Sequence, residues 1–220
     1  MKITILQELL NSLPNFNILA FTMDVKVEDS SITEEAICEY ERKIREEYSL
    51  SDILNIPLIK EARDGYKALG KDPSRYRLAC ESLLRRLVKG YGLYRINNVV
   101  DTGNILSLAI CRSTAVLDLD KIVGDVYIRL GTEADEYYGI GRGLINVNNI
   151  PLYCDEISPF GSPTSDTERT MITKDTKRIL LFVICFQNTY IEESKAMAIQ
   201  TFKKYAYAQN IKEIQVIKGK

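Results

Sequence analysis

The segment from Arg178 to Gln187 places the strongest constraint on how this chain can fold. It contains eight consecutive apolar residues, Ile179 to Phe186. A run of eight is too short to cross a bilayer. It also lacks the apolar–polar alternation of a strand that has one face in water. A continuous apolar run of this length is typical of a central strand, and we expect one here.

The other elements are predicted from periodicity, caps and turn residues. Alternation predicts strands at 16–27, 125–130 and 211–217, and a hairpin around Asn148-Asn149. Helical spacing and end signals predict helices at 33–48 (with Thr33 as N-cap), 58–69, from Pro73-Ser74 to Gly90, from Asn97-Asn98 to Ile110, and 191–209. No internal repeat or low-complexity linker interrupts the 220 residues, which favours one domain.

Composition excludes several kinds of chemistry. The chain has no histidine, so Ser-His-Asp and Cys-His catalysis and every histidine-ligated metal site are excluded. Its five cysteines are widely spaced without a C-x-x-C pair, which indicates reduced thiols rather than a disulfide framework or a zinc site. We therefore expect neither metal nor cofactor. With no visible signal peptide, we expect a cytoplasmic protein without membrane attachment.

The charge is distributed unevenly although the whole chain carries a net charge of only −1. Residues 26–52 contain nine acidic and four basic side chains, whereas residues 60–95 contain ten basic and four acidic ones. Tyrosines at 66, 76, 91 and 94 are interleaved with the basic side chains, a pattern that suits phosphate contacts and base stacking. Salt bridges between the two regions are the alternative explanation. The candidate RNA-binding residues are Arg75, Arg77, Arg85, Arg86 and Lys89.

Two further stretches are candidates for a site. Asp101, Asn104 and Ser107 follow one another at a spacing of three, along one side of an otherwise apolar predicted helix. Polar groups in such surroundings are either hydrogen-bonded or functional, and a network that fixes a following loop at 112–118 would explain them without a ligand. The loop from Ser158 to Thr170 is rich in hydroxyl groups and could offer them, with backbone N–H groups, to an anionic or carbonyl oxygen. It could equally be an ordinary connection.

These stretches together resemble a known family. NNVVDTGNILSLAI, VLDLDKI, VYIRLG and FGSPTSDTERTMIT, preceded by SRYRLACESLLRRLVKG, are similar to the B3/4 domain of the phenylalanyl-tRNA synthetase β-subunit. In that enzyme the domain hydrolyses tyrosine mischarged onto the phenylalanine tRNA. The resemblance spans about residues 58–209. It implies an α+β fold with a mixed β-sheet core and packed helices, a single domain over 1–220, and residues 1–57 as an N-terminal strand–helix extension.

The resemblance also implies a pocket between the 98–118 segment and the 158–170 loop. Asp166 would be its catalytic residue, and the Gly161 and Ser162 N–H groups would serve as oxyanion donors. The substrate-binding residues would be Asn98, Asp101, Asn104, Asp118, Asp155, Gly161, Ser162, Pro163 and Ser165. Two positions depart from the family pattern. The synthetase histidine is replaced by Ala115, and a pocket glutamate would fall near Arg142 or Gly143.

Two hypotheses for function follow. The first is a free-standing hydrolase that removes the amino acid from a mischarged tRNA, in which positioning, oxyanion donors and a water-orienting carboxylate would suffice for a labile ester. The second is a module that binds tRNA, another RNA or a small amino-acid-like ligand without turnover. Neither requires DNA as a partner.

Overall fold

The apolar run forms strand β9 (Arg178–Cys185), which lies inside a four-stranded sheet. In the computed structural model, which describes residues 1–219, β9 pairs antiparallel with a strand on each side. The expectation of a central strand is therefore confirmed. The order across the sheet is β10 (Gln209–Ile214), β2 (Asn17–Asp24), β9 and β3 (Thr114–Asp118).

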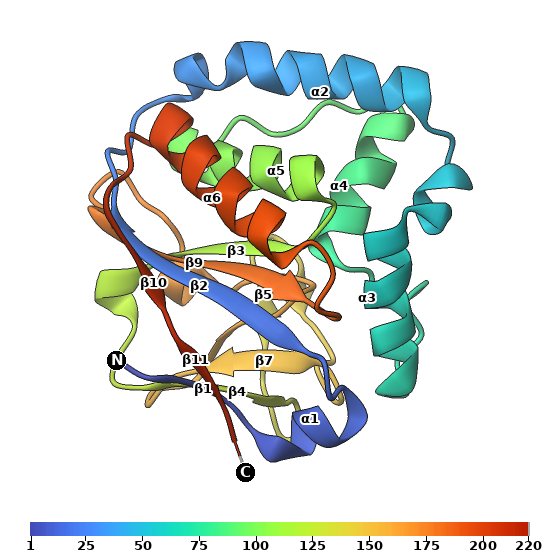
Figure 1. Cartoon of the computed structure of the whole chain (residues 1–220), viewed down its shortest axis with the longest axis vertical. Coiled ribbons are helices and arrows are strands. Elements are labelled where there is room, and N and C mark those ends of the chain that lie inside the picture. The colour runs from blue at the N-terminus through green and yellow to red at the C-terminus, as the bar shows by residue number, and fades with distance from the viewer. Residues whose placement is uncertain (220) are drawn as a thin grey trace.

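A second, mixed sheet faces the first (Figure 1). Its strand β1 is parallel to both of its neighbours, while the remaining pairs are antiparallel. The order is β11 (Val216–Lys218), β1 (Ile3–Ile5), β4 (Val126–Leu130), β7 (Pro151–Cys154) and β8 (Pro159–Gly161). A separate short hairpin is made by β5 (Tyr138–Gly139) and β6 (Gly143–Leu144).

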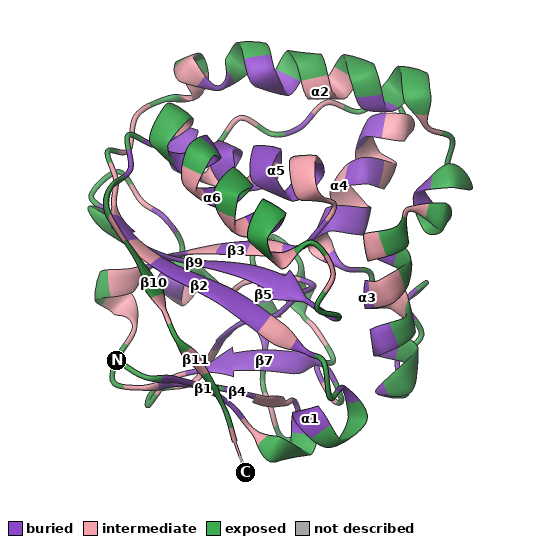
Figure 2. Ribbon diagram, in the orientation of Figure 1, coloured by how far each residue is buried: buried purple, intermediate pink, exposed green. Residues whose placement is uncertain are grey.

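Strand alternation divides the core between the two faces of the four-stranded sheet. On β9, Leu180 and Phe182 point into the cluster between the sheets, and Leu181 and Val183 point into the cluster beneath the helices. All four side chains are fully buried. Figure 2 shows this double-sided burial as the continuous purple of β9. It is the physical reason why β9 is apolar at every position after Arg178.

Helices cover the face of this sheet that is turned away from the second sheet (Figure 1). Residues of α5 and α6 pack on the sheet, and α2, α3 and α4 form a further cluster with α5. The bounds are α1 (Gln7–Ser12), α2 (Glu34–Glu47), α3 (Pro57–Ala68), α4 (Ala79–Val88), α5 (Asn98–Ile110) and α6 (Ile191–Tyr205). The α+β prediction is confirmed. No helix within residues 1–219 is long and apolar enough to cross a membrane.

The start of α4 was predicted wrongly. The Pro73-Ser74 segment forms a turn held by Asp72 rather than the start of a helix. Oδ1 of Asp72 accepts the Ser74 N–H at 2.8 Å, and its carbonyl oxygen accepts the Tyr76 N–H at 3.0 Å. Such an Asx turn competes with helix formation. The helix begins only at Ala79, so Arg75 and Arg77 lie in the turn that precedes it.

Two other local predictions also fail, and a third is correct in position only. Thr33 is the N-cap residue of α2, as predicted, but its side chain makes no capping bond, since its hydroxyl donates to the Ser30 carbonyl at 2.8 Å. Residues 114–118, expected in a loop, are strand β3. Asn148-Asn149 does not close a hairpin, because β7 pairs with β4 and β8 instead. Ile145 and Val147, expected in its first strand, pack in a small cluster with Leu152.

Candidate functional site

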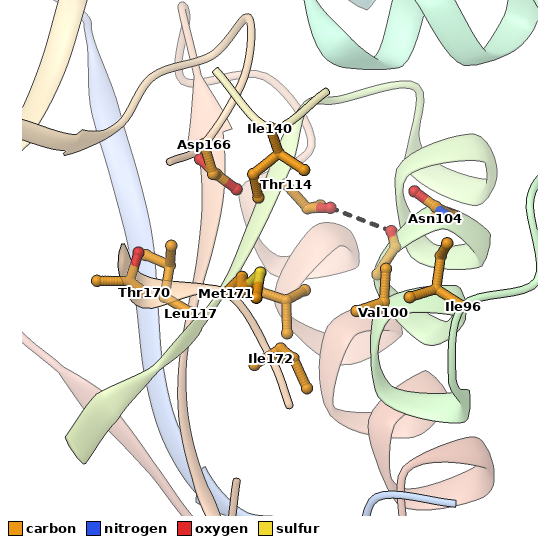
Figure 3. Close-up of a pocket in the computed structure, with 12 residues that line it drawn as sticks. Ile96, Val100, Asn104, Thr114, Leu117, Ile140, Asp166, Thr170, Met171 and Ile172 are labelled. Atoms are coloured by element: carbon orange, nitrogen blue, oxygen red, sulfur yellow. Dashed lines mark hydrogen bonds between the residues drawn. The ribbon is translucent and has the colours of Figure 1, made fainter. Parts of the chain in front are cut away.

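A cavity of about 240 Å³ opens beside β3 (Figure 3). Helix α5 forms one wall, β3 the floor, and residues 166–172 the opposite wall. Most of the lining is apolar, and its polar side chains are Asn104, Thr114, Asp166 and Thr170. The apolar lining residues are Ile96, Val100, Val116, Leu117, Ile140, Met171 and Ile172.

A glycine sets the distance between α5 and β3. A Cβ on Gly103 would lie 2.5 Å from Cγ2 of Val116, so only glycine permits this approach without displacing the cavity floor. The Thr114 hydroxyl donates to the Gly103 carbonyl at 3.0 Å, the contact drawn as a dashed line in Figure 3. The Thr114 hydroxyl hydrogen is therefore engaged within the wall itself.

Asp166 is the one ionisable side chain that lines the cavity. The backbone carbonyl of Asp166 accepts the Ile140 N–H at 2.9 Å, and this bond fixes the backbone at Asp166. The residue keeps some exposure through the cavity mouth, but its Oδ1 atom is buried and has no hydrogen-bond partner among the described residues. The hydroxyl of Thr170 is buried and unpartnered in the same way. Unsatisfied polar atoms of this kind are rare in folded proteins and indicate a place for a ligand or water.

The surroundings of Asp166 change its acidity. Loss of solvent raises the pKa of its carboxyl to about 8, and the nearby backbone N–H of Ser162 offsets only part of this effect. Gly161 allows the close packing responsible, since a Cβ there would lie 2.7 Å from Oδ1 of Asp166. The raised pKa favours the protonated form of this carboxyl at neutral pH.

The cavity contains two of the ten residues predicted for the catalytic and substrate site, Asn104 and Asp166. Asn98 and Asp101 lie on α5 but are fully buried away from the cavity. Asn98 accepts the Glu28 N–H at 2.7 Å and donates to the carbonyls of Lys26 and Tyr205, each at 3.0 Å. It joins three segments of backbone.

Asp101 and Ser107 of the polar stripe also have structural partners. Asp101 accepts the Ile96 N–H at 3.1 Å and the Thr33 hydroxyl at 3.3 Å. Ser107 donates to the carbonyl of Arg112 at 2.6 Å, which fixes the start of the 112–118 segment. In this stripe only Asn104 lines the cavity.

The two other predicted aspartates support turns. Asp118 accepts the Asp120 N–H at 3.1 Å and the Thr176 hydroxyl at 2.7 Å. Asp155 forms an ion pair with Arg169 at 2.8 Å and accepts three backbone N–H groups, those of Val123, Ile157 and Ser158. Both carboxylates therefore have structural partners on each oxygen, and neither lines the cavity.

Residues 161–165 form a closed turn rather than a row of donors. The Ser162 hydroxyl donates to the Ser165 carbonyl at 2.8 Å and accepts the N–H groups of Thr164 at 3.3 Å and Ser165 at 3.1 Å. The Pro163 carbonyl accepts the Ala79 N–H at 2.8 Å, tying the turn to α4. None of Gly161, Ser162, Pro163 and Ser165 lines the cavity.

Ala115 is the one residue within 114–117 of β3 that does not line the cavity. Its neighbours on β3, Thr114 and Val116, line the cavity, whereas Ala115 is buried in the cluster between the two sheets. The position at which the family histidine was expected therefore does not face this cavity. Arg142 and Gly143, near which the family glutamate was expected, are exposed at the β5–β6 turn.

The predicted RNA-binding residues fall into two groups. Arg75, Arg77 and Lys89 are exposed and make no ion pair within residues 1–219. Arg85 is half-buried, 3.6 Å from the fully buried carboxylate of Glu81, which also pairs with Arg63 at 2.8 Å. Arg86 is half-buried and hydrogen-bonded to the carbonyl of Gly92 at 2.5 Å.

Sequence reasoning missed most of the cavity lining. Thr170 lies at the end of the loop that was singled out, but nothing marked its hydroxyl as buried and unpartnered. Ile96, Ile140 and Met171 were missed because apolar residues in irregular segments carry no periodic signal. Each is also partly exposed at the cavity mouth.

Comparisons with known proteins agree with this architecture. The model of the B3/4 domain matches residues 61–219. Among solved structures, the chain is similar to an N-terminal fragment of the phenylalanyl-tRNA synthetase β-subunit from Pyrococcus horikoshii, with a TM-score of 0.55 and 11% identity. The match covers 99% of this chain and 52% of that one, so the chain spans about half the length of the fragment. No curated protein matches the sequence.

We predict that Asn98→Ala destabilises the fold while Asn104→Ala does not. The first change leaves the Glu28 N–H and two carbonyl groups without partners, at about 1–3 kcal/mol for each buried group that water cannot reach. The side chain of Asn104 makes no hydrogen bond among the described residues, so its removal is expected to lower the free energy of unfolding by less than about 0.5 kcal/mol. Urea unfolding of both variants measures the difference, and equal midpoints would contradict the structural role of Asn98.

We predict that Asp166 makes stability fall as pH rises. The native carboxyl, with a pKa of about 8, retains a proton that the unfolded chain releases near pH 3.8, so its contribution is complete below pH 3.8 and lost through pH 8. Asp166→Asn cannot titrate. Its free energy of unfolding relative to wild type should therefore rise by about 4 kcal/mol between pH 5 and pH 9, because each pH unit below the native pKa contributes about 1.4 kcal/mol.

Urea titrations at pH 5, 7 and 9 test this linkage. Asp175→Asn, a change at an exposed carboxyl, is the matched control and should leave the pH dependence of wild type unaltered. If the free energies of unfolding of wild type and Asp166→Asn changed equally with pH, the pKa of Asp166 would not be raised in the native state.

Proposed function

The chain belongs to the B3/4 domain family, and from this premise we propose that it binds the aminoacyl end of a tRNA and hydrolyses the ester in trans. The observation that carries the proposal is the apolar cavity with a single carboxyl in its wall, that of Asp166, whose buried Oδ1 has no hydrogen-bond partner among the described residues. The motif resemblance to a synthetase editing domain supports the choice of substrate. The proposed setting is the cytoplasm, where tRNA is charged.

The size and lining of the cavity suit one amino acid. A volume of about 240 Å³ corresponds to roughly eight water molecules at ~30 Å³ each. It is smaller than the roughly 300–1,000 Å³ of sites that enclose drug-sized ligands. An aminoacyl side chain can be enclosed, whereas a nucleotide would have to remain outside. The apolar residues of α5, β3 and the 166–172 wall would then replace water around that side chain.

Asp166 is the proposed catalytic residue. A carboxyl with a pKa of about 8 is a stronger base, once ionised, than an ordinary aspartate, and can orient and deprotonate a water that attacks the ester carbon. An incoming α-ammonium group would favour the ionised form by Coulomb attraction. Entry of the substrate would thereby prepare the base at neutral pH.

A non-catalytic binding module is the second candidate, and one observation favours it. The hydroxyl of Ser162 is engaged within its own turn, and neither Gly161 nor Ser162 lines the cavity. No oxyanion donor is therefore positioned by this loop. On this hypothesis the cavity would bind an amino-acid-like ligand, with or without RNA, and release it unchanged.

We predict that the protein deacylates mischarged tRNA faster than the spontaneous reaction and that Val100→Phe and Asp166→Asn each remove this acceleration. Phenylalanine at position 100 would fill the cavity from α5, and asparagine at position 166 would remove the base. In wild type, kcat/KM should rise with pH and level off above about pH 8, as the carboxyl ionises. Release of labelled amino acid from a panel of aminoacyl-tRNAs measures the rates.

Binding distinguishes the two candidates. A nonhydrolysable aminoacyl-adenosine should bind wild type and not Val100→Phe, whether or not turnover occurs. Binding without deacylation of any tested tRNA would establish the binding module and exclude the hydrolase. Absence of both would exclude the cavity as an aminoacyl site.

We also predict that Arg75→Glu/Arg77→Glu weakens tRNA binding and reduces its salt dependence. Both side chains are exposed, so reversal of their charge should leave the fold intact. Loss of two phosphate contacts should lower the slope of log affinity against log salt by about 1.5. Lys203→Glu/Lys204→Glu on α6 is the matched control. An unchanged slope in the first variant would exclude the 71–78 turn as a phosphate contact.

A further inference from the structure

The segment that follows α4 carries a second feature that points to nucleic acid. The helix ends in a Schellman motif, in which the Gly90 N–H bonds to the Leu87 carbonyl at 2.9 Å and the Tyr91 N–H bonds to the Arg86 carbonyl at 3.1 Å. Gly90 has the positive φ of 85° that this motif requires. The motif turns the chain back and brings Tyr91 beside Arg86.

Arg86 lies against two exposed tyrosines. Its guanidinium carbon is 4.1 Å from the ring centroid of Tyr94 and 5.6 Å from that of Tyr91. Hydrogen bonds to the Gly92 carbonyl at 2.5 Å and to the Tyr94 hydroxyl at 3.2 Å hold the guanidinium in place. Tyr91 and Tyr94 nevertheless remain 60% and 66% exposed. The structure therefore presents two aromatic rings to solvent with a cation fixed against them.

The backbone beneath these rings is anchored. Leu93 is buried, and its N–H donates to Glu41 of α2 at 2.8 Å. Arg95 bridges Glu34 and Glu41, at 2.8 Å and 2.5 Å. The carboxylates nearest to the segment are thus occupied by its own backbone and by Arg95. The cationic groups Arg86 and Lys89 face no such partner carboxylate within residues 1–219.

The same segment leads directly into the cavity wall. Ile96, two residues after Tyr94, lines the cavity and is itself 59% exposed, and its N–H is held by Asp101 at 3.1 Å. The tyrosines and this part of the cavity wall therefore belong to one short segment. On the proposed function, the nucleotide end of an aminoacyl-tRNA would extend out of the cavity along this segment.

We propose that Tyr91, Arg86 and Tyr94 form a stacking platform for an unpaired base near the 3′ end of the RNA. Exposed aromatic rings with an adjacent fixed cation bind bases through stacking and cation–π attraction. A protein partner would require a contact of about 800 Å² with an apolar centre, whereas these rings are bordered by charged side chains. The inference rests on the proposed function, because it assigns the part of the same substrate that lies outside the cavity.

Binding of a labelled single-stranded RNA pentamer to the full chain tests the platform. Tyr94→Ala should weaken binding at least tenfold, equivalent to about 1.4 kcal/mol, and Tyr91→Ala should weaken it by a smaller factor. Tyr94→Phe, which keeps the ring and loses only the hydroxyl contact to Arg86, should stay within threefold of wild type. Tyr127→Ala, at an exposed tyrosine of β4 in the other sheet, is the matched control and should bind as wild type does.

The outcomes separate this platform from the cavity. Tyr94→Ala should leave binding of an amino acid methyl ester, which has no base to stack, unchanged. Equal RNA affinity of wild type and Tyr94→Ala overturns the platform, even where the ester binds and the proposed function stands. Equal losses in Tyr94→Phe and Tyr94→Ala also overturn it, because the hydroxyl rather than the ring would then be responsible. Ester binding that fails while RNA binding depends on Tyr94 counts against the cavity alone.

Discussion

Burial of β9 and β2 on both faces is the constraint on which the rest of the structure depends. A strand that is apolar at every position needs a sheet on one side and helices on the other, and the two core clusters supply them. The order β10–β2–β9–β3 then leaves β3 at the edge. No further strand within residues 1–219 pairs with β3, and the space beside it is closed mainly by α5 and by residues 166–172, with Ile96 and Ile140 at its margin. The cavity is a consequence of this edge.

At the N-terminus of α5, polar side chains close to the cavity make structural hydrogen bonds instead of lining it. Asn97 caps the helix by accepting the N–H groups of Val99 and Val100, and Asn98 bonds to three segments of backbone. Their partners include residues 26–28, which precede the matched family region, and the end of α6. Residues 1–57 also contribute β1 and β2 to the two sheets. The position of α5, and with it the cavity wall, therefore depends on segments at both ends of the chain.

The sequence predicted the elements that depend on periodicity and missed those that depend on side-chain partners. The apolar run identified β9, and helical spacing identified α2, α3, α5 and α6 to within a few residues. The bond from Asp72 that delays α4 and the bond that diverts Thr33 from its cap could not be read from spacing. The same limit applies to the site. Asp101, Asn104 and Ser107 are equivalent by spacing, and only their tertiary partners show that Asn104 alone lines the cavity.

The position of Ala115 in the fold changes how the missing family histidine is interpreted. Ala115 is buried between the sheets and does not line this cavity, so the position expected for the family histidine lies outside it. The cavity's chemistry has to come from groups that the fold leaves unpaired. Both side-chain oxygens of Asp101, Asp118 and Asp155 already accept hydrogen bonds within the protein. Asp166 is the exception, because its Oδ1 is buried without a partner among the described residues and the residue itself lines the cavity. On the proposed function, a cation, water or hydroxyl group that enters the cavity would supply the partner that this carboxyl lacks.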